Sequence, residues 1–261
     1  MALIEKLNAI GDAIRSKTGK EDKLTLEQMV TEIEGIEVGG NDSAAQDIEQ
    51  VWNGEIVDLA FNIDTIPAYG CYKGRMKTIT INSNDISIGS YAFQYSTLLE
   101  EVIVNSVSGE VAGSIFSGCT SLKSITWLHE SFDKNQNVSD VFCACSALTD
   151  VNIPNLSKIG KGWFKDCSSL EKLDTYARHI NDNAFLRSAI DTFITRKTDA
   201  VATLTSINAF QGTPIESGTG YIYVPKALIE DYKVATNWIN FAEQFRAIED
   251  YPEICGGAEN D

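Results

Sequence analysis

The amino-acid sequence predicts an α+β fold: a solenoid of stacked coils with short parallel strands, an N-terminal helical hairpin and a C-terminal strand-helix cap. Three observations support this prediction. A unit of 21 to 26 residues is repeated through the middle of the chain. Each copy ends in a few residues that alternate between apolar and polar, which is typical of a short strand with one buried face. The first 37 residues instead carry apolar residues at helical spacing, and near the other end a short strand is followed by a proline that can start a helix.

The repeated unit is anchored by a phenylalanine. In the first four copies a small residue follows three positions later, a leucine six later and another apolar residue nine later. The fifth copy is one residue shorter, and the sixth is looser. One coil cannot bury these groups alone, so each is expected to stack on the same position of its neighbours. The anchors, separated by 23, 26, 22, 21 and 25 residues, are Phe93, Phe116, Phe142, Phe164, Phe185 and Phe210.

An earlier segment that starts at Ile66 looks like a degenerate first coil. Cys71 would take the place of the phenylalanine, and Ile79 and Ile81 would be the buried residues of its strand. The strand then lies one residue closer to the anchor than in the next coils. The array is therefore predicted to begin before the first phenylalanine.

The pattern I-G-x-x-A-F-x-x-C-x-x-L-x-x-V/I-x-I resembles the BspA-like leucine-rich repeat, and the repeat lengths fall in the leucine-rich range. The resemblance covers roughly residues 66–225. It implies a right-handed leucine-rich-repeat solenoid with a role in adhesion and ligand binding. Members of this family share no catalytic residues, so the resemblance implies a protein that is not an enzyme.

Three of the six cysteines, Cys119, Cys145 and Cys167, occupy the small position of the repeat, which Ser96 and Ser188 fill in other coils. A metal or redox site would not tolerate that exchange, so these residues are interpreted as reduced, packed thiols. The alternative is a disulfide between adjacent coils. Strand alternation would direct Cys143 away from Cys145, and Cys255 is expected to be an exposed thiol in the tail.

The chain before the repeats divides into two parts. Residues 1–37 are predicted to form two short amphipathic helices, with Leu3, Leu7 and Ile10 on the first and Met29 and Ile33 on the second. Helices of this length are marginal alone, which predicts an attachment or oligomerisation module. Residues 38–65 are interpreted as a linker, rich in Gly, Ser and Asp at its start, and an N-terminal cap.

Residues 226–261 are predicted to form a C-terminal helical cap and an acidic tail. A strand at 221–224 would precede it, and Pro225 would start the helix. The cap would cover the exposed apolar end of the last coil. Its aromatic cluster consists of Tyr232, Trp238, Phe241 and Phe245.

Both ends also resemble tail and baseplate-associated proteins of phages that infect Gram-positive bacteria. The matching stretches are LNAIGDAIRSKTGKEDKLTLEQMVTEIEGI and YIYVPKALIEDYKVATNWINFAEQFRAIED. This resemblance implies a virion protein made in the host cytoplasm and bound to other tail or baseplate proteins through its N-terminal helices. It also leaves room for a homo-oligomer and for a glycan or protein of the host surface as a further partner.

Charge and motifs exclude several classes of function. The formal net charge of −16 argues against a nucleic-acid partner, because phosphate binding needs a basic surface. No apolar run is long enough for membrane insertion, and the first residues do not resemble a signal peptide. His129 and His179 lie in no catalytic or zinc motif. No catalytic residue, cofactor or metal site is therefore predicted.

The expected binding face is the solvent side of the strand ladder. Plain solvation of this face is the alternative, and the loop at 128–137 is a second candidate surface. The candidate residues are Ile103, Thr126, Asn152 and Asp174 at one repeat position, with Glu101, Ser124, Asp150 and Lys172 two residues earlier in each coil.

Three functions follow from these observations. The first is a non-enzymatic structural and binding protein of a phage tail or baseplate, which presents the repeat surface to a host receptor. The second is a bacterial cell-surface or secreted leucine-rich-repeat adhesin. The third is a tail-associated glycan hydrolase, for which no pair of carboxylates stands out in the sequence.

Overall fold

The structure is a computed structural model that describes residues 65–66, 68–81, 87–105, 111–128, 138–154 and 156–256. The expected helical hairpin of residues 1–37 lies outside the described residues. So do most of the linker, His129 with the rest of the 129–137 loop, and the last five residues of the tail.

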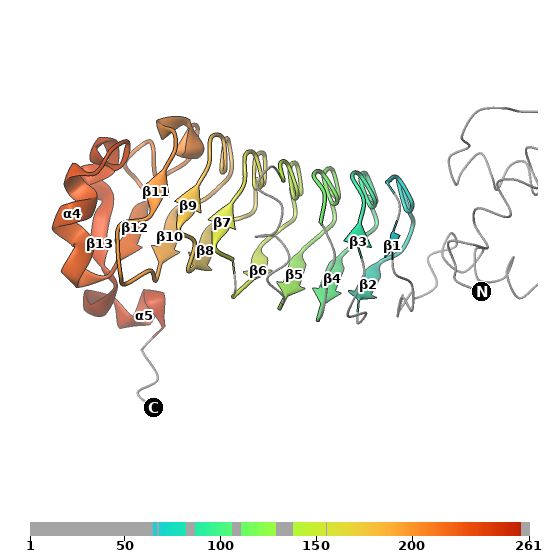
Figure 1. Ribbon diagram of the computed structural model, residues 1–261, viewed down its shortest axis with the longest axis horizontal. Helices are drawn as coiled ribbons and strands as arrows, with labels where there is room; N and C mark the ends of the chain where they lie inside the picture. The colour runs from blue at the N-terminus through green and yellow to red at the C-terminus, as the bar shows by residue number, and fades with distance from the viewer. Residues whose placement is uncertain are drawn as a thin grey trace, which may run out of the picture.

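The described chain is a row of coils stacked along the long axis of the molecule (Figure 1). Each coil contributes one long strand, and all pairings between these strands are parallel. Two sheets result, with the orders β2-β4-β5-β6 and β13-β12-β10-β8. The first contains β2 (Thr78–Ile81), β4 (Glu101–Val104), β5 (Ser124–Trp127) and β6 (Asp150–Asn152). The second contains β8 (Lys172–Thr175), β10 (Thr192–Thr195), β12 (Tyr221–Val224) and β13 (Phe245–Ala247).

A second row of strands, each two residues long, was not predicted. The apolar residues that open three copies of the repeat, Ile88, Ile159 and Ile180, lie in this row and are buried there. Two residues are too few to show an alternation, so the sequence pattern gave no strand signal. The row contains β1 (Thr65–Ile66), β3 (Ser87–Ile88), β7 (Lys158–Ile159), β9 (His179–Ile180) and β11 (Thr203–Leu204).

Strand register confirms the alignment of the repeats. Val102 of β4 pairs with Ile125 of β5, which pairs with Val151 of β6. Ile79 pairs with Val102, as the one-residue shift of the degenerate coil requires. The amide of Cys71 donates to Ala92 O, so Cys71 occupies the turn position of a phenylalanine.

The six phenylalanines form one continuous stack inside the solenoid. Successive ring centroids lie 5.3, 5.8, 5.5, 5.6 and 5.2 Å apart, and the planes differ by at most 13°. All six side chains are fully buried. Aromatic pairs of this kind contribute about 0.5–1.5 kcal/mol each beyond their buried area. The anchor of each coil is therefore held by the anchors on either side.

The turns around the first five phenylalanines bond to the next coil through their backbone. The amide of Phe116 donates to Val141 O at 3.0 Å and that of Phe142 to Trp163 O at 3.0 Å. The turn takes this shape because the residues two before and two after the phenylalanine have positive φ, as at Ser114 (57°) and Gly118 (76°). Left-handed residues reverse the chain within a few positions, which leaves the amides free to bond along the stack.

The C-terminal residues combine a strand with short helices. Phe210, the last ring of the stack, ends the 3₁₀ helix η2 (Ile207–Phe210). Its ring centroid lies 5.4 Å from that of Phe241 and 6.0 Å from that of Trp238. Strand β13 pairs with β12 and was not predicted. The remaining helices are η3 (Lys226–Leu228), α4 (Ile229–Val234), η4 (Trp238–Gln244), η5 (Ile248–Asp250) and α5 (Pro252–Cys255).

Two hydrogen bonds fix this aromatic group on the coil beneath it. The indole Nε1 of Trp238 donates to Ala202 O at 2.6 Å, and the amide of Ala202 donates to the Tyr232 hydroxyl at 2.9 Å. Both side chains are fully buried with their polar atoms satisfied. The cluster of four aromatics therefore covers the last ring of the phenylalanine stack.

Truncation of a central ring should destabilise the whole array. Replacing Phe142 by alanine leaves a cavity between Phe116 and Phe164, and we expect the free energy of unfolding to fall by about 3–5 kcal/mol. Urea denaturation followed by circular dichroism measures this. Thr126→Ala, at a half-exposed position, serves as the control and should change stability by less than about 0.5 kcal/mol. Equal losses in the two variants would contradict the role of the stack.

Candidate binding face

The outer strand face consists of the side chains on the long strands that point away from the core. On β4 the buried residues are Val102 and Val104, so Glu101 and Ile103 face outward. Pairing places Glu101 beside Ser124 and Ser124 beside Asp150, and it does the same for Ile103, Thr126 and Asn152. The structure thus brings six of the eight predicted residues together in two columns on one sheet.

Exposure and chemistry vary across this sheet. Glu101, Asp150 and Asn152 are exposed, whereas Ile103, Ser124 and Thr126 are half-buried. Each column also extends to β2, where Thr78 lies beside Glu101 and Thr80 beside Ile103. These two threonines were missed because the degenerate first coil was left out of the predicted face. The columns together present hydroxyl, amide and carboxylate groups.

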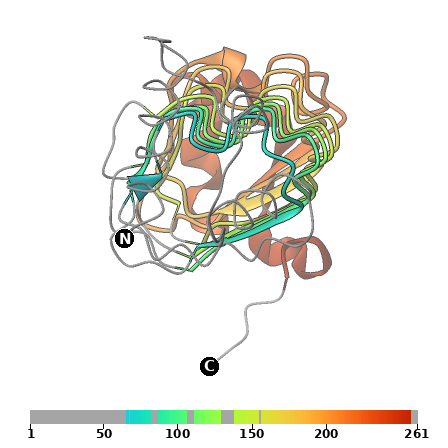
Figure 2. The same cartoon turned by 90° about the vertical axis from the view of Figure 1, so that its right-hand side faces the viewer.

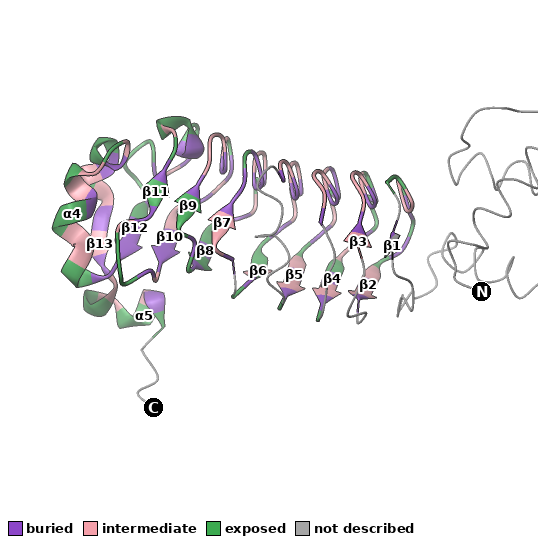
Figure 3. Ribbon diagram, in the orientation of Figure 1, coloured by how far each residue is buried: buried purple, intermediate pink, exposed green. Residues whose placement is uncertain are grey.

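Lys172 and Asp174 lie on the second sheet, where the outer strand face differs. Pairing places Asp174 beside Ile194, and Ile194 beside Tyr223. Ile194 and Tyr223 point outward but are only 0% and 2% exposed, because Cys255 of α5 and its neighbours pack on them. In Figure 3, β10 and β12 are mainly purple (buried), whereas β6 is mostly green (exposed). The C-terminal segment therefore covers this half of the face.

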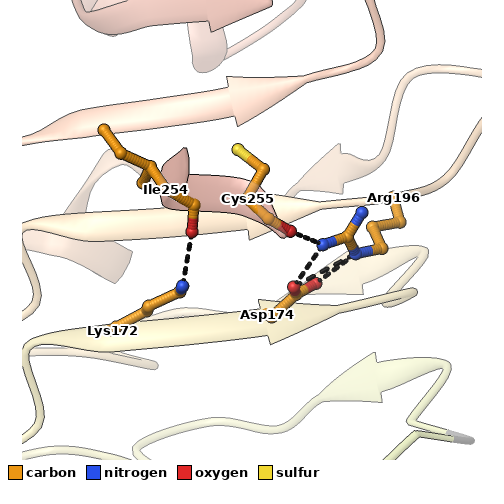
Figure 4. Close-up of polar contacts among 5 residues, drawn as sticks. All are labelled: Lys172, Asp174, Arg196, Ile254 and Cys255. Carbon is orange, nitrogen blue, oxygen red and sulfur yellow. Dashed lines mark hydrogen bonds and ion pairs between the residues drawn. The ribbon is translucent and has the colours of Figure 1, made fainter. Parts of the chain in front are cut away.

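Three polar side chains, named here the C-terminal clamp, hold that segment in place: Lys172, Asp174 and Arg196 (Figure 4). The Arg196 guanidinium donates to both carboxylate oxygens of Asp174, at 2.8 and 2.7 Å, and also to the carbonyl of Cys255. The Lys172 ammonium donates to Ile254 O at 2.5 Å. The last carbonyls of a helix lack partners within it, so these two cations satisfy acceptors that α5 leaves open.

The hydrogen bonds that Arg196 donates to Asp174 raise the pKa of Arg196 above its usual value, so the guanidinium stays charged. Lys172 and Asp174 are exposed but bind the end of the chain, on a different sheet from the other six predicted residues. That the eight residues bind a ligand stays a prediction, and the outer strand face is divided in a way the sequence did not indicate. The physical reason is that alternation determines which side of a strand a residue takes, whereas it carries no information on what packs there.

Cys255 is likewise not the exposed thiol that was expected. It is 2% exposed, and this burial raises the pKa of its thiol. A signal was present in the sequence: Ile194 and Tyr223 are apolar residues at outward positions, which implies that something covers them. Only the part of the tail beyond Gly256 lies outside the described residues.

The cysteines of the repeat form a hydrogen-bonded ladder. The thiols of Cys119, Cys145 and Cys167 each lie 3.2 Å from the carbonyl of the phenylalanine in the preceding coil. Ser96 makes the equivalent bond to Cys71 O at 3.1 Å, which explains why serine and cysteine exchange at this position. All six cysteines are unpaired. Burial raises the pKa of the Cys119 thiol to about 12, so it stays protonated and unreactive.

Neither a metal site nor a membrane-spanning helix is found in the described part of the chain. No group of three or more His, Cys, Asp or Glu side chains within it could hold a metal ion. No helix within it is long and apolar enough to cross a membrane. Of the two histidines only His179 is described, and it is exposed on β9.

Comparison with known proteins supports the type of repeat. Residues 64–192 match, in six copies, the model of the BspA type leucine rich repeat region. A leucine-rich repeat protein of Bacteroides ovatus has a similar structure, with a TM-score of 0.57 and 22% identity, over 71% of this chain and 45% of that one. A leucine rich cell surface protein of Faecalibacterium prausnitzii matches with a TM-score of 0.45 and 22% identity, over 63% of this chain and 43% of that one.

The match thus covers less than half of either solved chain, and a comparison with curated proteins gives no match. At 22% identity the likeness to the Bacteroides ovatus protein concerns the fold. Residues 64–192 thus match repeats of the BspA type, and the long strands continue beyond the matched residues to β12 and β13.

Loss of the clamp should expose Cys255. In Arg196→Ala the segment loses a charge-assisted hydrogen bond, worth about 1.5–3 kcal/mol, so opening should increase roughly tenfold or more. We expect Cys255 to react correspondingly faster with a thiol reagent, measured at neutral pH on protein that carries Cys143→Ser. Removal of the Arg196 charge alone would raise the pKa of Cys255 and slow the reaction, so a faster rate reports exposure.

Arg187→Ala is the matched control, because Arg187 also makes a two-bond pair with an aspartate of the preceding coil, Asp166, on a turn. This variant should leave the rate at Cys255 unchanged. If Arg196→Ala also reacts at the native rate, the clamp does not hold α5.

Proposed function

We propose that the chain is a non-enzymatic binding protein of the adhesive kind, and that its ligand lies across the outer strand face of β2, β4, β5 and β6. The observation that carries this proposal is the contrast between the two sheets. On the second sheet the outward residues Ile194 and Tyr223 are apolar and buried under α5, whereas on the first sheet Glu101, Asp150 and Asn152 are polar and exposed.

The geometry of the first sheet suits a ligand that spans several coils. Parallel strands about 4.8 Å apart repeat the same two outward positions four times, which gives a regular row of groups. Threonine and serine hydroxyls and the Asn152 amide can each donate or accept a hydrogen bond. Glu101 and Asp150 lie in one column with Ser124 between them. Together with the net charge of −16, these carboxylates favour a ligand with basic groups, such as a protein segment.

The family type supports binding in preference to catalysis. Residues 64–192 match the BspA type of leucine-rich repeat, and this resemblance implies a structural or binding protein with a role in adhesion. A cell-surface or secreted adhesin is therefore the setting that we propose. Attachment to a phage tail through residues 1–37 stays a prediction, because those residues lie outside the described part of the chain.

Charge reversal on the open sheet tests this function. We expect Glu101→Lys/Asp150→Lys to bind intact bacterial and mammalian cells about tenfold more weakly than the native chain, as the loss of charged hydrogen bonds implies. Flow cytometry of the fluorescently labelled protein measures the binding. Asp231→Lys/Glu243→Lys carries the same charge change on exposed residues of α4 and η4 and should bind as the native chain does.

The matched control separates a contact on this face from a general effect of net charge. Equal binding by the native chain and the Glu101→Lys/Asp150→Lys variant would contradict the proposed face. A native chain that binds neither kind of cell would contradict the adhesive function itself.

A further inference from the structure

Four tyrosines gather on the turns that follow β1 and β3. The rings of Tyr69 and Tyr91 are stacked, with centroids 4.9 Å apart, and Tyr72 meets Tyr69 and Tyr95 edge-on at 5.7 and 5.9 Å. We call this group the tyrosine patch. Viewed along the stack, the turns lie across the coil from the long strands, so the patch is separate from the outer strand face (Figure 2).

The patch presents flat aromatic surface to solvent. Tyr69 is 52% exposed and Tyr95 is 47% exposed. The Tyr95 ring rests directly on the turn of the next coil, since a Cβ at Gly118 would lie only 2.3 Å from a ring atom. One side of this ring is thus fixed against bare backbone, and Tyr72 of the preceding coil meets the ring edge-on, which leaves it 47% exposed. Tyr69 is held in the same way by its stacking on Tyr91.

The fold does not require aromatic residues at these positions. Tyr69 and Tyr91 lie two residues before the anchor of their coil, where later coils have Ser114, Asp140 and Asn183. All five have φ between 54° and 61°. Tyr95 lies two residues after the anchor, where the next two coils have glycine and alanine. Bulky side chains are rare in the left-handed region, and such strain collects at functional sites. Three tyrosines in these turns therefore call for an explanation other than folding.

The charge around the patch differs from that of the whole chain. Lys73 belongs to the same turn as Tyr69 and Tyr72, and its ammonium lies 5.4 Å from the centre of the Tyr72 ring. Arg75 follows two residues later, and both cations are exposed. On a chain with a net charge of −16, this coil combines exposed aromatic rings with positive charge.

We propose that the tyrosine patch is a binding site for a sugar ring that carries a carboxylate, such as a uronic or sialic acid. A pyranose has an apolar CH face that can lie on the exposed parts of the Tyr69 and Tyr95 rings, and hydroxyls that can bond to the phenol oxygens. The carboxylate pairs with the Lys73 ammonium. An anchoring side chain of a protein partner gains most in a pocket that encloses it, whereas these rings form an open platform. The site does not depend on the function proposed for the outer strand face.

Titration calorimetry with two acidic probes tests the site: a galacturonic acid tetramer and sialyllactose. The native chain should bind at least one of them. Tyr69→Asn/Tyr95→Ala should weaken this binding roughly tenfold or more, the effect typical of aromatic anchors. These substitutions copy Asn183 and Ala144, which hold the same turn positions in other coils. The variant should therefore keep the native fold, and its circular dichroism spectrum and thermal melting are measured alongside, so that a loss of binding by folded protein cannot be attributed to unfolding.

Two further binding measurements, one with a Lys73 variant and one with an acidic peptide, define the chemistry of the ligand. Lys73→Gln should weaken binding of the acidic sugar several-fold and leave binding of the methyl ester of the same tetramer unchanged. A hexaglutamate peptide should not compete. If neither acidic probe binds, the proposal is wrong. If the peptide binds and the tyrosine substitutions abolish its binding, the patch is a site for an acidic protein segment. If Tyr69→Asn/Tyr95→Ala binds the sugar as the native chain does, the sugar lies elsewhere.

Discussion

The contact between neighbouring coils at the phenylalanine turn is the interaction on which the rest of the structure depends. Three interactions meet there: the ring stacks on the ring of the next coil, the turn amides donate to that coil, and the small residue three positions later donates back to the preceding one. A single coil has none of these partners within itself. Each repeat position therefore has the same place relative to the neighbouring coils. Serine can replace cysteine because both donate to the equivalent carbonyl of the preceding coil.

An array built in this way has two ends that must be covered, and the C-terminal end also determines which surface is open. Phe210 is covered by Trp238 and Phe241, and the chain then continues through β13 to α5 on the outer side of β10 and β12. The clamp formed by Lys172, Asp174 and Arg196 fixes it there. The same type of outward position thus has opposite roles in the two sheets: it binds the chain's own end in one and faces solvent in the other.

Much of this architecture could be predicted from the sequence, because the repeats carry the register. The place of Cys71, the one-residue shift at Ile79 and the side on which Glu101 to Asn152 lie all follow from spacing. The two-residue strands could not be predicted, since they are too short to show a period. The docking of α5 depends on contacts between Cys255 and residues some 30 to 60 positions away, and no local pattern encodes such a contact. The tyrosine patch is similar: the tyrosines are visible in the sequence, whereas their left-handed turns and mutual stacking are not.

Amide hydrogen exchange of the native chain, followed by NMR, tests the central claim most directly. The amides of Phe116, Phe142 and Phe164 lie in turns outside the long strands, and turns ordinarily exchange faster than strands do. Because each donates to the next coil, the account predicts that they exchange as slowly as the amide of Ile125 in the middle of β5. Fast exchange at these three turn amides, with slow exchange confined to the long strands, would contradict it.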